Sequence, residues 1–155
     1  MATFTTTLVI PRPLAATFAF VTDFRNAPLW DPHTYAAQQI TPGPVGLHTK
    51  FLLRGGLLGQ QTLERLPGPN VLRPSMALPY EVVAFVPEHE MVIRGETALL
   101  RYEDHLLFAA EGDTTRLRYT ATMALQGVRA VGNPLLQPLL AMLGAAATRD
   151  LPAAV

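Results

Sequence analysis

The sequence predicts an α+β protein in which a curved antiparallel sheet of about seven strands surrounds one long C-terminal helix. Residues 34–126 consist of short strand-like runs separated by Gly and Pro turns, whereas residues 135–151 are mostly Leu, Ala and Met. The terminal helix is the one large apolar element available to cover the sheet, so the sheet is expected to curve around it. We expect residues 1–155 to form a single domain, a length that can bury one good core.

A strand and two short helices are expected to open the chain. Residues 3–10 alternate between an apolar face and a Thr-rich face, and this period of two is typical of a strand. A first helix follows Pro13, which suits a first helical turn because its missing N–H would have no partner there. Asp23 is expected to end this helix and to cap a second short turn over residues 25–30.

A long meander is expected in the middle of the chain, because Gly, Pro and Asp punctuate apolar runs of strand length there. The turns leave one segment unassigned, residues 67–77, which we expect to be a loop. The strands are predicted at 34–41, 47–54, 59–66, 78–86, 91–97, 99–110 and 114–125.

The last hairpin gives a specific prediction of side-chain direction. With Gly112-Asp113 as a two-residue turn, residue 108 faces residue 117, and alternate residues point to the same side. The opposite side is mostly charged or hydroxylated and is expected to face solvent. The inward face then holds Tyr102, Asp104, Leu106, Phe108, Leu117, Tyr119, Ala121 and Met123.

The C-terminal helix is expected to be apolar nearly all round, as a buried or partnered helix is. Asn133-Pro134 is expected to form its cap and first turn. Pro138 either moves the start to Gln137 or bends the helix. The apolar stripe is predicted to hold Leu136, Leu139, Leu140, Leu143 and Ala147.

Several segments share their order and turn positions with a known superfamily. They are Ile10-Pro11-Arg12-Pro13, the helix carrying Phe18 and Phe24, residues 26–32, the turn Gly43-Pro44-Val45-Gly46, and residues 46–51, 80–87, 91–95 and 115–120. Together they resemble the START-like (SRPBCC) helix-grip superfamily, especially its polyketide cyclase/dehydrase branch. The resemblance covers essentially the whole chain. It implies a helix-grip fold that forms a cup for one apolar molecule.

Composition excludes several classes of function. Lys plus Arg and Asp plus Glu both number 12, so the excess of cations that nucleic-acid binding needs is absent. The chain has no Cys, which excludes disulfides and thiolate chemistry. We predict no stable membrane insertion, since no run reaches the ~18 uninterrupted apolar residues of a membrane span. A cytoplasmic location is expected because the N-terminus lacks the pattern of a signal peptide.

Low charge content indicates surplus apolar surface. Charged residues make up 15% of the chain, against roughly 25% in typical soluble domains, so an internal cavity, a homodimer face or an exposed apolar patch is expected. We predict that a hydrophobic small molecule binds in the cup, and the alternative is a filled core. The lining is predicted to be Trp30, Phe51, Tyr80, Phe85, Tyr102, Asp104, Tyr119, Met123, Leu136 and Leu140.

Asp104 is the candidate for chemistry. Because an unpaired inward carboxylate is costly, it is expected to pair with an Arg, to act as an acid or base with a raised pKa, or to orient a ligand hydroxyl. A bulge or a slipped register would place it in water instead. Arg54 and Arg101 could either hold an anionic ligand group or form salt bridges at strand edges.

Three functions stay open at this point. The first is binding of a hydrophobic or aromatic molecule, such as a lipid or a polyketide-like metabolite. The second, implied by the resemblance, is a cyclase/dehydrase-type enzyme that uses Asp104, Tyr102, Tyr119 and His48. The third is an interaction protein that uses the apolar C-terminal helix. No metal and no cofactor are predicted, because His33, His48, His89 and His105 lack the spacing of metal ligands.

Overall fold

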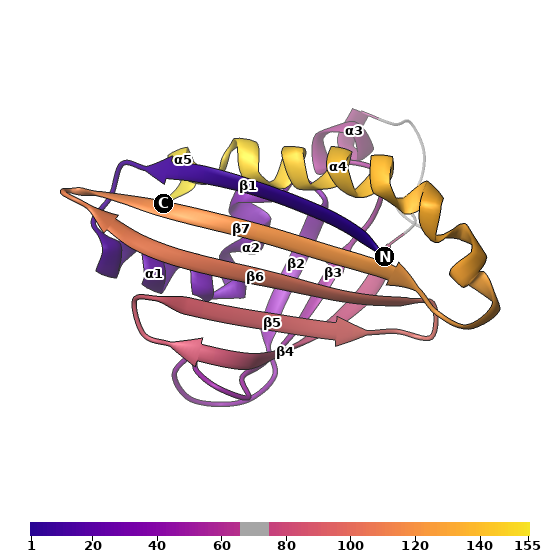
Figure 1. Ribbon diagram of the computed structural model, residues 1–155, viewed down its shortest axis with the longest axis horizontal. Coiled ribbons are helices and arrows are strands. Elements are labelled where there is room, and N and C mark those ends of the chain that lie inside the picture. The colour runs from indigo at the N-terminus through magenta and orange to yellow at the C-terminus, as the bar shows by residue number, and fades with distance from the viewer. Residues whose placement is uncertain (66–74) are drawn as a thin grey trace.

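A computed structural model describes residues 1–65 and 75–155. In these residues the chain forms a seven-stranded antiparallel sheet that curls around a long C-terminal helix (Figure 1). The strands are β1 (Ala2–Ile10), β2 (Thr34–Gln39), β3 (Lys50–Gly55), β4 (Met76–Val86), β5 (Glu90–Glu96), β6 (Leu100–Glu111) and β7 (Thr114–Leu125). Their order, β1-β7-β6-β5-β4-β3-β2, is a meander in which the first strand lies beside the last. This is the predicted helix-grip architecture.

Helical segments cover one face of the sheet. They are α1 (Leu14–Thr22), the 3-10 turn η1 (Phe24–Asn26), α2 (Ala27–Trp30), α3 (Gln60–Arg65), the 3-10 turn η3 (Gly127–Gly132), α4 (Asn133–Arg149) and α5 (Leu151–Ala154). The longest of them, α4, packs against β1 and β7 and also contacts α2. In Figure 1 it runs alongside β1, so it closes the concave side of the sheet.

The start of the chain follows its sequence pattern. Along β1 the Thr side chains at alternate positions are exposed, whereas Phe4 and Leu8 are half-buried against the core. Asp23 ends α1 and caps η1, because its carboxylate accepts the backbone N–H of Arg25 at 3.1 Å. The same carboxylate pairs with the Arg25 guanidinium at 2.6 Å. The predicted strand, helix and capped turn are therefore confirmed.

The β6–β7 hairpin has the predicted register. Residue 108 pairs with 117, and Asp104 pairs with Ala121. The side chains of Asp104, Ala121 and Tyr102 are all buried. A period of two pinned by a tight turn thus sets the direction of every side chain on two long strands.

Two strand predictions need correction. The strand predicted at 59–66 is wrong over its described part, since Gln60–Arg65 is the helix α3. Gln, Leu, Glu and Arg are good helix formers, and Leu63 is the one buried side chain, whereas a strand would bury alternate residues. The strand expected from residue 47 begins at Lys50 because His48 has a φ of 67°, which a strand does not accommodate. The loop expected at 67–77 lies largely outside the described residues, and its last two residues are not loop, because Met76 and Ala77 begin β4.

Helix α4 begins at Asn133, so the alternative start at Gln137 is wrong. The Asn133 Oδ1 accepts the backbone N–H of Leu125 at 2.7 Å, which ties the helix to the end of β7. Pro138 lies inside the helix but close to its start, where its missing N–H removes a single backbone bond. The predicted stripe faces the sheet, and Leu136 and Leu140 are buried.

The segment Gly127–Ala154 also has the length and composition of a membrane-spanning helix. A single helix that covers the core of a protein meets the same criteria. Here the segment changes from a 3-10 turn to an α-helix at Asn133, and its apolar stripe packs on the sheet. The predicted lack of membrane insertion stays a prediction.

Candidate ligand-binding site

A cavity of about 370 Å³ lies between the sheet and α4. One wall comes from β6 and β7, the opposite wall from the stripe of α4, and the remainder from α2, β2, β3 and β4. All five predicted stripe residues of α4 take part in this lining. The apolar lining side chains are chiefly Leu53, Met76, Leu78, Met123, Leu136, Leu139, Leu140 and Leu143.

The cavity gathers most of the predicted site residues. Those that line it are Trp30, Tyr80, Tyr102, Asp104, Tyr119, Met123, Leu136 and Leu140. Two others belong to the filled core: the Phe51 ring packs 5.9 Å from Phe24, and the Phe85 ring packs 5.4 Å from Phe18. A register shift between Val82 and Ala84 interrupts the alternation of β4 just before Phe85. Contact of the lining residues with a ligand stays a prediction.

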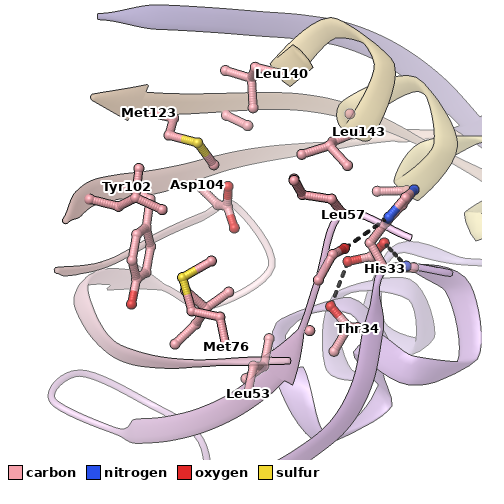
Figure 2. Close-up of a pocket in the computed structure, with 18 of the residues that line it drawn as sticks. His33, Thr34, Leu53, Leu57, Met76, Tyr102, Asp104, Met123, Leu140 and Leu143 are labelled. Carbon is pink, nitrogen blue, oxygen red and sulfur yellow. Dashed lines mark hydrogen bonds between the residues drawn. The ribbon is translucent and has the colours of Figure 1, made fainter. Parts of the chain in front are cut away.

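Asp104 projects from β6 into the cavity, close to Tyr102, Met123 and Met76 (Figure 2). Burial raises the pKa of its carboxyl to about 7, and the nearby Asp31 adds to the increase. A hydrogen bond with the Tyr119 hydroxyl offsets part of this shift. No Arg or Lys of the described residues forms an ion pair with Asp104. Of the sequence-based alternatives, the exposed position and the Arg pair do not match the described residues, whereas an acid–base role and the orientation of a ligand hydroxyl both stay predictions.

Three phenols surround this carboxyl. The Tyr102 hydroxyl donates to the backbone carbonyl of Pro79 at 2.6 Å, and the Tyr80 and Tyr102 rings lie 4.7 Å apart. Burial, followed by the negative charge of Asp104, raises the pKa of Tyr80, Tyr102 and Tyr119. Each hydroxyl therefore keeps its proton at neutral pH and is available as a hydrogen-bond donor.

Asp31 is a cavity residue that the sequence analysis missed. Its carboxylate accepts the backbone N–H of His33 at 2.9 Å and the Thr34 hydroxyl at 2.6 Å. Burial raises the pKa of Asp31, and these two hydrogen bonds offset part of the increase. An Asp that bonds the backbone two residues later is a familiar turn signal, so Asp31-Pro32-His33 indicated the turn. The sequence did not indicate that this turn faces a cavity.

The mouth of the cavity is formed by exposed side chains. Leu57 is 58% exposed and Leu99 is 40% exposed, and both line the cavity. Arg129 of η3 is also exposed and is the one Arg or Lys of residues 1–65 and 75–155 in the lining. Arg54 and Arg101 are exposed and lie outside it, and Arg101 pairs with Glu96 at 3.5 Å. For Arg101 the strand-edge salt bridge is the correct alternative.

The histidines are dispersed. His33 lies at the cavity wall, where its Nδ1 is 3.1 Å from the Gly56 carbonyl oxygen. His48 contacts Glu81 on the outside, and His105 contacts Glu90 on the outward face of the sheet. His48 is therefore not a cavity residue. Among the described residues, no three His, Asp or Glu side chains cluster so as to hold a metal ion.

Trp30 anchors α2 against the cavity wall. Its ring meets the Phe24 ring edge to face, with 6.4 Å between the centroids, and the side chain is buried. The indole Nε1–H is buried and has no hydrogen-bond partner in the described part of the chain. Trp30 therefore serves chiefly as an apolar surface.

The whole chain, residues 1–155, matches the sequence family described as "Polyketide cyclase / dehydrase and lipid transport". The chain belongs to this family. The polyketide cyclase/dehydrase family is part of the START-like superfamily, so the resemblance of the sequence motifs is confirmed. No curated protein sequence is significantly similar to this member of the family.

Solved structures show the same fold for this polyketide cyclase/dehydrase family member. TTHA0849 from Thermus thermophilus is 15% identical, with a TM-score of 0.72 over 98% of this chain and 95% of that one. A START superfamily protein from Mycobacterium smegmatis is 14% identical, with a TM-score of 0.69 over 99% and 94%. The Zhui aromatase/cyclase from Streptomyces sp. R1128 is 10% identical, with a TM-score of 0.73 over 97% and 91%. At these identities the likeness concerns the fold alone.

Proposed function

We propose that this polyketide cyclase/dehydrase family protein binds a hydrophobic small molecule, such as a lipid or a polyketide-like metabolite, in the cavity between the sheet and α4. The observation that carries the proposal is the apolar cavity of about 370 Å³. Ligand pockets usually measure roughly 300–1,000 Å³ and combine apolar walls with a few polar groups. Asp104 and the three phenols are such groups, and the family description supports the same ligand class.

Binding can be tested with N-phenyl-1-naphthylamine, an apolar dye whose fluorescence rises in a dry site. Ala121 lines the cavity on β7, so Ala121→Phe should fill part of it and weaken dye binding by about tenfold or more. The matched control is Ala109→Phe, on the exposed part of β6. Equal affinity in both variants, with both folded, would contradict the proposal. Native mass spectrometry of freshly purified protein would also reveal a retained ligand.

A second candidate function is acid–base catalysis by Asp104. The specific observation is a buried carboxyl that lines the apolar cavity together with Tyr119, and burial raises its pKa to about 7. Such a group takes up and releases protons at neutral pH, as a general acid or base must. As a base it would remove the α-proton of a β-hydroxyacyl substrate; the protonated Asp104 would then return that proton to the β-hydroxyl, which leaves as water as the C=C bond forms.

The catalytic candidate can be separated from simple binding. A β-hydroxyacyl thioester that forms a conjugated enoyl thioester on dehydration provides an optical assay. We expect a rate that rises through about pH 7 and is lost in Asp104→Asn, while Asp113→Asn in the exposed β6–β7 turn keeps it. An Asp104→Asn protein that still binds the dye and keeps its rate would exclude this candidate.

The interaction-protein alternative has less support. The apolar stripe of α4 that suggested it faces the cavity. Leu135 and Met142, which lie off that stripe, are the large apolar side chains of α4 left exposed. Homodimerisation stays a prediction, which light scattering over a range of concentrations would test.

A further inference from the structure

We propose that the cavity accepts its ligand in one orientation. The end of the ligand that reaches Asp104 carries a hydrogen-bond donor and no negative charge. Any anionic group of the ligand would lie at the mouth beside Arg129. This inference rests on the proposed function and narrows its ligand class. The ligand is an apolar molecule with a hydroxyl or amino group on the end that enters first, not a fatty-acid-like anion that enters by its carboxylate.

The charges that line the cavity are unevenly distributed. The ionisable side chains of its interior are the acids Asp31 and Asp104, the phenols Tyr80, Tyr102 and Tyr119, and His33. The negative field of Asp31 already disfavours the ionised form of the buried Asp104 carboxyl. A ligand carboxylate, sulfonate or phosphate beside Asp104 would add one more uncompensated anion.

Of the two acids of the cavity, Asp104 has more acceptor sites open. The Asp31 carboxylate already accepts two protein donors, the His33 N–H and the Thr34 hydroxyl. Among the described residues Asp104 has at most one, the Tyr119 hydroxyl, whereas a carboxylate offers about four lone-pair sites. The Tyr102 hydroxyl is committed to the Pro79 carbonyl and so does not occupy Asp104. A ligand O–H or N–H would fill one of the open sites.

Arg129 lies at the other end of the cavity. β6 runs inward from Leu100, at the mouth, to Asp104 four residues later, a span of roughly 13 Å at the rise of an extended strand. The backbone N–H of Gln126 donates to the Leu99 carbonyl at 2.9 Å and so holds the start of η3 beside that mouth. Arg129 follows in η3. The cation and the inner acid are therefore separated along the axis that a ligand would occupy.

The test compares ligands that share one apolar chain and differ in the end group. 1-Decanol, decylamine and decanoate compete with N-phenyl-1-naphthylamine at about pH 8, where Asp104 is ionised. We expect decanol and decylamine to displace the dye at concentrations about tenfold lower than decanoate. Decanoate that competes as well as decanol would overturn the inference while leaving the proposed function intact. Failure of the dye to bind would overturn both.

Two pairs of variants separate recognition of the ligand's end group from binding of its apolar chain. In Asp104→Asn the disadvantage of decanoate relative to decanol should shrink by about tenfold, whereas Asp113→Asn should leave the ratio unchanged. In Arg129→Gln decanoate should weaken several-fold and decanol should not change, and Arg118→Gln on the outward face of β7 is the control. A decanoate-to-decanol ratio that is the same in all four variants would show that the cavity does not sense charge. If Asp104→Asn does not fold, the Arg129→Gln and Arg118→Gln variants and the ranking of the three ligands in the native protein still test the inference.

Discussion

The Tyr102 hydroxyl on β6 donates a 2.6 Å hydrogen bond to the Pro79 carbonyl on β4, two strands away. The side chain reaches this carbonyl by crossing Gly95, its partner on the intervening strand β5. A Cβ at Gly95 would lie 2.8 Å from the Tyr102 hydroxyl oxygen and would also collide with the Pro79 carbonyl. The absence of a side chain at one position thus allows a phenol to span the wall of the cavity.

Gly95→Ala is expected to destabilise the protein by about 1–3 kcal/mol, the usual cost of inserting a methyl group into a packed site. The Tyr102–Pro79 hydrogen bond should be lost at the same time. Urea unfolding at equilibrium measures the effect. Gly46→Ala is the matched control, because no atom lies within 4 Å of a Cβ built there. Equal stability of the two variants would mean that the Tyr102 ring moves aside at no cost.

Stability is expected to fall as pH rises from about 4 to about 7. Asp104 has a folded-state pKa of about 7 against an ordinary value of 3.8, so in this window the folded protein binds more protons than the unfolded chain. The shift corresponds to at most about 4 kcal/mol, lost progressively as Asp104 ionises. Asp31, whose pKa is also raised, contributes in the same direction. Urea unfolding at several pH values measures the slope.

Asp104→Asn should flatten that slope. The stability of the variant relative to the native protein should therefore be higher above about pH 7 than below about pH 5. Asp113→Asn should keep the native slope, because Asp113 is exposed in a turn. Parallel pH profiles for the native protein and Asp104→Asn would show that Asp104 ionises normally and that water reaches it.

Neighbouring groups should move the pKa of Asp104 in opposite directions. Tyr119→Phe removes the hydrogen bond that lowers this pKa, so the pKa should rise. Asp31→Asn removes a negative charge that raises it, so the pKa should fall. Carbon-detected NMR of the Asp side chains, titrated over pH, measures both shifts. A common direction in the two variants would contradict this account of the carboxyl.

Helix α4 packs tightly against β1 at Gly144. A Cβ built there would lie 2.6–2.7 Å from atoms of the Phe4 ring on β1. In an exposed helix Gly→Ala gains about 1 kcal/mol, but here the collision should reverse the sign, so Gly144→Ala is expected to be less stable than the native protein. Thermal or urea unfolding measures this, with Ala145→Ser at the exposed neighbouring position as the control. A more stable Gly144→Ala protein would show that Phe4 repacks freely.

Local patterns predicted the parts of the fold that depend on near neighbours in the chain. The β6–β7 register followed from one tight turn and a period of two, which is why the inward position of Asp104 was correct. Residues 60–65 were mistaken for a strand because six residues with a single buried side chain satisfy either period.

Long-range relationships were not visible in the sequence. Asp31 meets Asp104 across the cavity from a turn that lies far away in the chain, and no periodicity connects the two. Phe85 was expected in the cavity lining but packs against Phe18 of α1, a contact between distant segments that no local pattern indicates. The contact of Tyr102 with Pro79 required the pairing of three strands to be known. The composition of the cavity wall was therefore predictable, but the arrangement of its acids was not.

The pairing of β1 with β7 affects how the protein folds during its synthesis. Ala2 lies opposite Met123, so β1 leaves the ribosome before its partner β7 has been made. Contacts between such distant segments slow folding. The helix α4, which rests on β1, comes later still. A newly made chain therefore has no enclosed cavity, and a ligand that binds there would stabilise only the finished molecule.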